Sequence, residues 1–299
     1  MANSIALSKK YAPILDEIYA YGALTSILEN DSFVREGAGA NEVLIPNVTL
    51  QGLANYSKGS GFVAGDVTFA WETHQLTQDR GRTFSIDAMD NEETLDLAIA
   101  STVGQFVRTK VTAEIDAYRF AKLASLAGNS AKTTLSKADA MEAIDTGLEV
   151  MADAEVDLSA CVIFVSNAVH TYLKQSALIT RQVMVSVGPV AINREIETLD
   201  GHPLVKVPAG RFNTEVTMLT GGSGQEAGGY TASGVDINFL IVDTNAVMGV
   251  KKHVMPRLFD PSVNQTADAW KFDYRIYHDL IVPDNKVDGI YLHSKVSGS

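Results

Sequence analysis

The side chains best suited to metal binding or nucleophilic catalysis are widely spaced along this 299-residue sequence. Its six histidines are never closer than 15 residues: His74, His170, His202, His253, His278 and His293. Neither an HExxH motif nor a His-x-His pair is therefore present, and a metal would need ligands that are distant in sequence. The one cysteine, Cys161, begins the apolar run CVIFV, where a thiol is typical of an inert core. We expect no catalytic residue, no metal and no cofactor.

Two further patterns that could suggest catalysis have simpler explanations. The loop Gly221-Gly222-Ser223-Gly224 lacks the Lys-Ser or Lys-Thr of a phosphate loop and does not match the dinucleotide fingerprint, so it predicts a surface loop. The acids Glu92 and Glu93 fall where a helix start favours negative charge. No Gly-x-Ser-x-Gly elbow occurs. The sequence therefore does not predict an enzyme.

Arg80 and Arg82 are the charged pair most suited to binding a partner. They surround a glycine at a turn predicted over Gln78–Gly81. Two guanidinium groups there could form bidentate ion pairs with a partner's carboxylates, or the turn could simply be solvated. Trp71, like Phe69 and Phe84, could anchor an interface or cover the inner face of its own strands. Both alternatives remain open for both groups.

Composition limits the classes of partner and compartment. The formal net charge is −12, from 36 acids against 24 Lys and Arg, which argues against a tight, sequence-independent grip on phosphate backbones. A single cysteine excludes an intrachain disulfide. No apolar run approaches about 20 residues and the N-terminus lacks the layout of a signal peptide, so we expect a cytoplasmic chain.

The candidate residues lie on or beside a predicted long hairpin. Val43–Leu50 is strand-like, although Pro46 interrupts it, and period-two alternation returns over residues 67–74. Between them, the stretch Gly52–Gly65 carries four glycines and predicts the hairpin tip. After the turn at Gln78, extended residues resume at positions 83–86.

One very long helix is predicted to follow the hairpin. Its start is marked by Asp90 or Asn91 as the cap, and apolar residues recur at helical spacing from Leu95 to Leu123. The stop is Gly128-Asn129, which gives about ten turns, or roughly 50 Å. Gly104 costs only about 1 kcal/mol, so we expect a single rod.

The remaining elements flank this core pattern. At the N-terminus, Tyr11–Leu28 is apolar enough to pack either on a neighbour or on its own body. Later elements are a helix from Ser136 to Met151, a strand over residues 161–165 buried on both faces, and a short helix from Asn167 to Lys174. Further strands are predicted at residues 183–207 and 216–219, and strands of one closing sheet at 237–242, 246–251, 270–282 and 289–292.

This order of parts resembles the major capsid protein of tailed bacteriophages, the Hong Kong 97-type fold, over nearly the whole chain. The blocks that carry the resemblance are GDVTFAWET from Gly65, LTQDRGR from Leu76, IDAMDNEET from Ile86, and YRIYHD from Tyr274, with Asn285-Lys286 and Gly289-Ile290-Tyr291. They are similar to blocks in capsid proteins from phages of Gram-positive hosts.

The resemblance implies an α+β fold in four parts. These are an N-terminal arm (1–42), an extended hairpin loop (43–89), a peripheral domain of spine helix and C-terminal strands (90–135 and 251–299), and an axial domain (136–250). It also implies self-assembly into hexamers and pentamers of an icosahedral virion shell around double-stranded DNA, without sequence-specific binding and without a membrane.

Further partners and contact residues also follow from the resemblance. It implies a portal and decoration proteins, and because no long helical segment precedes the arm we expect a separate scaffolding protein. Contacts between subunits are expected at Tyr56, Lys58, Phe62, Trp71, Arg80 and Arg82. Some relatives crosslink a loop lysine to a neighbour's asparagine; Lys58 lies at the tip, but the sequence identifies neither its partner nor the required acid.

Two other functions are compatible with parts of the pattern. An encapsulin-like compartment shell shares the fold but packages protein, so the contents of a purified particle distinguish it from a virus. A soluble enzyme with a distributed site would be a monomer that turns over a substrate. The glycine-tipped loop favours the viral shell, and the missing catalytic constellation disfavours the enzyme.

Overall fold

The computed structural model describes residues 22–29, 35–36, 42–59, 61–93, 104–176 and 198–296. Its strands are β1 (Arg35–Glu36), β2 (Glu42–Leu50), β3 (Val67–Gln75), β4 (Gln78–Asp87), β5 (Asn129–Lys132), β6 (Cys161–Ser166), β7 (Thr198–Leu199), β8 (His202–Val207), β9 (Asn213–Met218), β10 (Tyr230–Asp243), β11 (Met248–Phe259), β12 (Ala269–Ile281) and β13 (Ile290–Ser294). Its main helices are α1 (Ala88–Glu93), α3 (Thr112–Leu126), α4 (Ala140–Asp153) and α5 (Asn167–Gln175), with short helical turns η1 (Thr25–Leu28), η2 (Val107–Val111), η3 (Leu158–Ala160), η4 (Ala209–Arg211) and η5 (Asp284–Gly289). No helix in these ranges is both long and apolar enough to cross a membrane.

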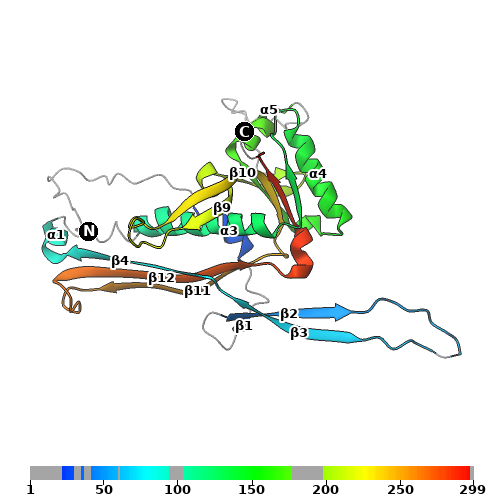
Figure 1. Cartoon of the computed structure of the whole chain (residues 1–299), viewed down its shortest axis with the longest axis horizontal. Coiled ribbons are helices and arrows are strands. Elements are labelled where there is room, and N and C mark those ends of the chain that lie inside the picture. The colour runs from blue at the N-terminus through cyan, green and yellow to red at the C-terminus, as the bar shows by residue number, and fades with distance from the viewer. Residues whose placement is uncertain are drawn as a thin grey trace, which may run out of the picture.

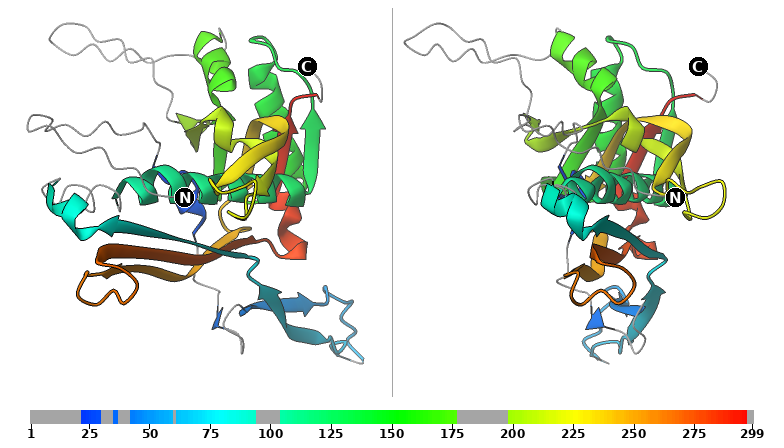
Figure 2. Two further views of the ribbon diagram at one scale, coloured as in Figure 1. Left: turned by 60° about the vertical axis from the view of Figure 1, so that its left-hand side comes forward. Right: turned by 90° about the vertical axis from the view of Figure 1, so that its left-hand side faces the viewer.

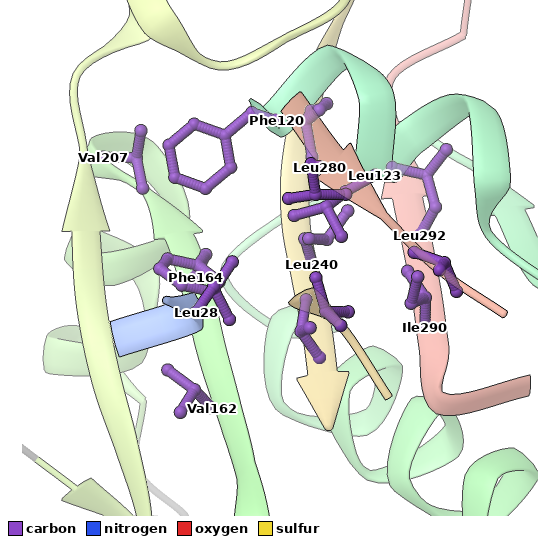
Figure 3. Close-up of a cluster of buried hydrophobic side chains, with 14 of the residues drawn as sticks. Leu28, Phe120, Leu123, Val162, Phe164, Val207, Leu240, Leu280, Ile290 and Leu292 are labelled. Carbon is purple, nitrogen blue, oxygen red and sulfur yellow. The ribbon is translucent and has the colours of Figure 1, made fainter. Parts of the chain in front are cut away.

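A seven-stranded sheet forms the centre of the molecule, in the order β5-β13-β10-β6-β8-β7 with β9 paired to β10. Helix α3 covers one face, and α4 and α5 cover the other (Figure 1). Strand β6 alternates between the two cores: Phe164 packs toward α3, while Ile163 packs toward α4. Figure 3 shows the first core, in which the Phe120 ring lies edge-on to Phe164, with centroids 5.1 Å apart. The predicted doubly covered strand is therefore confirmed.

A second sheet has the order β11-β12-β4 and lies beneath α3 (Figure 1). Its inner face packs Phe272, Tyr274 and Ile276 against Ile115 of the helix. The expectation of one closing sheet is wrong, because β11 and β12 lie here whereas β10 and β13 pair in the seven-stranded sheet. Strand β13 lies between β10, to which it is antiparallel, and β5, to which it is parallel, so it does not pair with β12.

The predicted hairpin is confirmed as β2 paired with β3, from Glu42↔Gln75 to Leu50↔Val67. It projects away from the two sheets, as the views in Figure 2 show. Pro46 does not break β2. Strand β1 pairs only with Val43 and Leu44, so at Pro46 the missing N–H removes no described ladder bond on that side.

The long helix is described over residues 104–126 and is not a uniform rod. A π-helical turn, η2, precedes α3. The hydroxyl of Thr109 donates to the Gln105 carbonyl at 2.7 Å, and that of Thr112 donates to Val107 at 3.1 Å, so side chains compete with the regular ladder there. Predicted helix residues 94–103 lie outside the described part.

The ends of the helices differ by a few residues from expectation. Helix α1 begins at Ala88, and the Asp87 carboxylate accepts from the Met89 N–H at 2.9 Å, so the cap is neither Asp90 nor Asn91. Beyond the C-terminal end of α3, position 128 must be a glycine, because a Cβ at this position would lie 2.7 Å from the Val287 carbonyl oxygen. Helix α4 begins at Ala140 rather than directly after Ser136, whose hydroxyl instead binds Asp139.

Residues 22–29 pack on the chain's own body. The fully buried Leu28 enters the core beside Phe120 (Figure 3). The buried Asp116 carboxylate accepts the Thr25 N–H at 3.1 Å and its hydroxyl at 2.7 Å. One turn along α3, Arg119 donates to Glu29 at 2.8 Å. These hydrogen bonds attach η1 to α3. The rest of the predicted segment, before residue 22, lies outside the described part, as do residues 183–197 of the predicted strand segment 183–207.

Candidate interaction surface

Side chains that could perform chemistry do not form a site in the described residues. No group of three or more His, Cys, Asp or Glu side chains there could hold a metal. Cys161 is buried in β6, and burial raises the pKa of its thiol to about 12, so it is not an activated nucleophile. The loop between β9 and β10 is exposed over residues 221–227. The feature that remains is the projecting hairpin.

The hairpin has one apolar and one polar face. Directly paired residues share a face, so the register Pro46↔Trp71, Val48↔Phe69 and Leu50↔Val67 puts six apolar side chains on one side. We call this side the apolar face. The opposite side, the polar face, carries Thr49 paired with Thr68 and Asn47 paired with Ala70, and Asn47 donates to Glu72 at 2.6 Å.

The apolar face is exposed to solvent. Phe69 and Trp71 pack edge to face, with ring centroids 5.4 Å apart, yet remain 56% and 44% exposed. Val48, Leu50 and Val67 are exposed as well. A single-domain monomer rarely leaves such a contiguous apolar surface in water, so this face is a candidate for contact with another molecule.

The hairpin tip continues this exposed apolar surface. Ser57 and Gly61 form an antiparallel bridge, which holds Lys58 at the turn and brings the Tyr56 and Phe62 rings to 4.9 Å. Phe62 is 90% exposed and Leu53 fully exposed. Neither residue belongs to a core cluster of the described residues. The predicted contact residues Tyr56, Lys58 and Phe62 are therefore brought together.

The base of the hairpin, by contrast, is firmly attached. Val43 and Ile45 are buried with Leu76 against the start of β11 and the end of β12. Thr77, between β3 and β4, donates to the buried Asp279 carboxylate from both its N–H and its hydroxyl. Tyr118 of α3 donates to the other carboxylate oxygen at 2.7 Å. Burial raises the pKa of Tyr118 to about 12, so the phenol remains a donor.

The turn predicted over Gln78–Gly81 is wrong, because these residues begin strand β4 and pair with β12. Long-range pairing overrides local turn chemistry here, and Gly81 serves a close approach: a Cβ would lie 2.9 Å from the Tyr274 carbonyl oxygen. Arg80 pairs with Glu114 of α3 at 2.5 Å and donates to the Leu219 and Gly229 carbonyls.

Arg82 donates to the Glu226 carbonyl at 2.8 Å. Both arginines thus hold the β9–β10 loop within their own subunit, and they lie apart from Trp71 and the tip residues. Phe84 packs inside, with its ring centroid 4.9 Å from that of Phe106.

Sequence reasoning missed Val48, Leu50 and Val67 as members of the apolar face. The sequence did contain a signal for them, because apolar residues occur at every second position of both strands. Whether the two sets lie on the same face of the hairpin, however, depends on the pairing register across a 16-residue loop (51–66), which the sequence does not specify.

A cavity of about 610 Å³ lies between β4, helix residues 105–115 and the β9–β10 loop. Phe84, Phe106 and Tyr274 line it, and their rings contact one another. Arg82 and the exposed Lys110 also line it. The cavity is therefore an aromatic pocket flanked by cations.

Comparison with known proteins finds similarity only at the level of structure. No protein-family model matches the sequence, and no curated protein matches it. Several solved structures match the fold. The capsid structure of cyanophage P-SCSP1u matches with a TM-score of 0.69 at 15% identity, covering 97% of this chain and 93% of that one. The asymmetric unit of the bacteriophage PhiM1 mature capsid matches with a TM-score of 0.66 at 12% identity, covering 98% and 93%.

A structure of Mycobacterium phage Che8 matches with a TM-score of 0.59 at 14% identity, covering 98% of both chains. Each of these matches extends over nearly the full length of both chains. The chain therefore has the α+β fold of phage capsid structures, as the resemblance in its sequence predicts.

Proposed function

We propose that the chain is the major capsid protein of a tailed bacteriophage, a structural subunit of an icosahedral head that encloses double-stranded DNA. The observation that carries this proposal is the hairpin: in a fold shared with phage capsids, its apolar face and tip are largely exposed to solvent in the part of the chain that the structure describes. Hexamers and pentamers would cover such surfaces on neighbouring copies. The role needs no catalysis.

We propose that the chain is divided into four parts. Residues 1–42 are the arm, 43–89 the extended loop, 90–135 and 251–299 the peripheral domain, and 136–250 the axial domain. Strand β13 pairs with β10 of the axial part, so the C-terminal strand joins the two domains. The contact residues proposed are Tyr56, Lys58, Phe62 and Trp71 directly, with Arg80 and Arg82 acting through the β9–β10 loop that they hold.

The proposed partners are other copies of the chain, a separate scaffolding protein, a portal and decoration proteins. Assembly would take place in the host cytoplasm and end in the virion. DNA would be contained rather than gripped, because a net charge of −12 leaves few phosphate contacts. Fluorescence anisotropy of the free subunit with duplex DNA should give weak binding; a nanomolar, salt-sensitive affinity would contradict this part of the proposal.

Purified particles test the function directly. The chain, expressed with the other head proteins of its phage, should sediment as closed shells that contain DNA. Shells that contain a protein cargo instead would identify an encapsulin-like compartment. A chain that stays monomeric at high concentration with its scaffold present would contradict both shell functions.

A further inference from the structure

The cavity between β4, helix residues 105–115 and the β9–β10 loop has the size and the lining of a small-molecule site. Its volume of about 610 Å³ is within the range of roughly 300–1,000 Å³ that is usual for ligand pockets, which combine apolar and aromatic walls with a few polar groups. None of the described residues that line it belongs to the β2–β3 hairpin. The cavity is therefore separate from the apolar face and the tip.

Three aromatic rings in the lining form a continuous apolar wall. The centroid of the Phe106 ring lies 4.9 Å from that of Phe84 and 5.8 Å from that of Tyr274, and both pairs pack edge to face. Burial raises the pKa of Tyr274, so its phenol is uncharged at neutral pH. An aromatic ring of a ligand can therefore pack against this wall.

The charged groups of the lining have a positive excess, although the chain as a whole has a formal net charge of −12. Three cations, Arg80, Arg82 and Lys110, line the cavity with one acid, Glu114, and this acid pairs with Arg80. The buried His278 adds no charge at neutral pH, since burial lowers its pKa to about 4. Arg82 and Lys110 therefore favour an anionic group in the cavity.

The β9–β10 loop holds Arg82 in place. Its guanidinium donates to the Glu226 carbonyl at 2.8 Å. It also lies so close to Gly228 that a Cβ there would be 2.9 Å from Nη1. A guanidinium has five N–H donors, so the bond to Glu226 leaves others for the oxygens of an anion. Lys110 is exposed and supplies a second positive charge to the lining.

We propose that this cavity binds a small aromatic compound with one acidic group. Its rings would pack on Phe84, Phe106 and Tyr274, and its carboxylate, sulfonate or phosphate would lie beside Arg82 and Lys110. The rings supply affinity through apolar burial, and the two cations select an anion over a neutral compound of the same shape. The inference goes beyond the proposed capsid function and does not depend on it.

Two fluorescent probes that differ in one group test the cavity in the purified subunit. Anilinonaphthalene sulfonate is an aromatic anion, and phenylnaphthylamine has the same ring system without the sulfonate. The sulfonate should occupy one tight site per subunit and bind several-fold more tightly than the neutral probe. Lys110→Gln should weaken the sulfonate about twofold to fivefold, the effect of losing an exposed ion pair, and leave the neutral probe unchanged. Lys137→Gln, at an exposed position outside the lining, should change neither.

A variant with a filled cavity distinguishes this site from other apolar surfaces. Ala113→Trp should abolish the tight site in a subunit whose circular dichroism spectrum is unchanged, whereas Phe62→Ala, at the exposed hairpin tip, should keep it. Naphthoate, an aromatic carboxylate, should displace the sulfonate and raise the melting temperature of the unmodified chain but not that of Ala113→Trp. If Ala113→Trp does not fold, the comparison of Lys110→Gln with Lys137→Gln decides alone.

Two results would overturn the inference. One is a sulfonate probe that binds no more tightly than the neutral probe. The other is binding of the sulfonate to Lys110→Gln, and to a folded Ala113→Trp, that equals its binding to the unmodified chain. Either result leaves the capsid function intact, because these measurements use the free subunit and the capsid function is tested on particles.

Discussion

Asp279 accepts two hydrogen bonds from Thr77, a residue 202 positions earlier, each at 2.8 Å. Thr77 lies where the hairpin ends and β4 begins, and Tyr118 of α3 binds the second oxygen of the same carboxylate. One buried side chain therefore fixes the direction of the hairpin relative to both the second sheet and the long helix.

Removing this carboxylate should loosen the base of the hairpin. In Asp279→Ala, the Thr77 N–H and the Tyr118 hydroxyl lose their acceptor, and leaving such groups unsatisfied costs about 1–3 kcal/mol each. We expect the free energy of unfolding in urea to fall by roughly 3 kcal/mol. Asp153→Ala, at an exposed position at the end of α4, should be nearly neutral. Equal stability of the two variants would contradict the role of Asp279.

Asp116 should matter more, because it is a buried charge with several partners. It accepts hydrogen bonds from the Leu24 and Thr25 N–H groups and from Arg211, whose guanidinium lies at 3.0 Å. Asp116→Ala leaves Arg211 without this counter-charge, so the loss of stability should be about 3–5 kcal/mol. Thr25→Val, which removes the hydroxyl that donates to Asp116 and accepts from Arg119 but keeps the Thr25 N–H bond, should cost about 1 kcal/mol.

A double-mutant cycle checks the Asp116 prediction. Adding Arg211→Met to Asp116→Ala should cost less than the sum of the single changes, since each single change already breaks the ion pair between the two side chains. Strictly additive losses would show that the two side chains act independently.

His278 should make the folded chain sensitive to mild acid. Burial, followed by the charge of Arg119, lowers the pKa of its imidazole to about 4. The unfolded chain therefore takes up a proton near pH 6.5 that the folded chain does not. Stability should fall as the pH drops from about 6.5 toward 4, by about 3 kcal/mol in total, and should be unaffected above this window.

Thermal melting at several pH values separates this effect from others. His278→Phe keeps a flat ring against Tyr118, whose ring centroid lies 5.4 Å from that of His278. It should remove most of the slope of melting temperature against pH. Some slope should remain, because burial also lowers the pKa of His293. His202→Gln should retain the full slope. An unchanged slope in His278→Phe would show that another group titrates.

The elements that the sequence predicted well carry local signals. The apolar run of β6 and the glycine-rich tip each specify their own structure. Arg80 and Arg82 show what local signals miss: Gln-Asp-Arg-Gly favours a turn, yet pairing such as Arg80↔Ile276 makes it a strand. Contacts such as Asp279 with Thr77 or Asp116 with Thr25 join distant residues, so no local pattern indicates them. The apolar face could be predicted in part. The alternation of its apolar residues is visible in the sequence, but the pairing register that places them on one face is not.

Sedimentation velocity of the chain with and without its hairpin tip shows whether the tip is needed for shell assembly. Replacing residues 53–64 with a short Gly-Ser turn removes the exposed Leu53, Tyr56 and Phe62 side chains, which belong to none of the cores formed by the described residues. The variant should keep the circular dichroism spectrum and melting temperature of the full chain but stay as subunits under conditions where the full chain forms shells. Shells that form normally without the tip would contradict the claim that this hairpin is an assembly element.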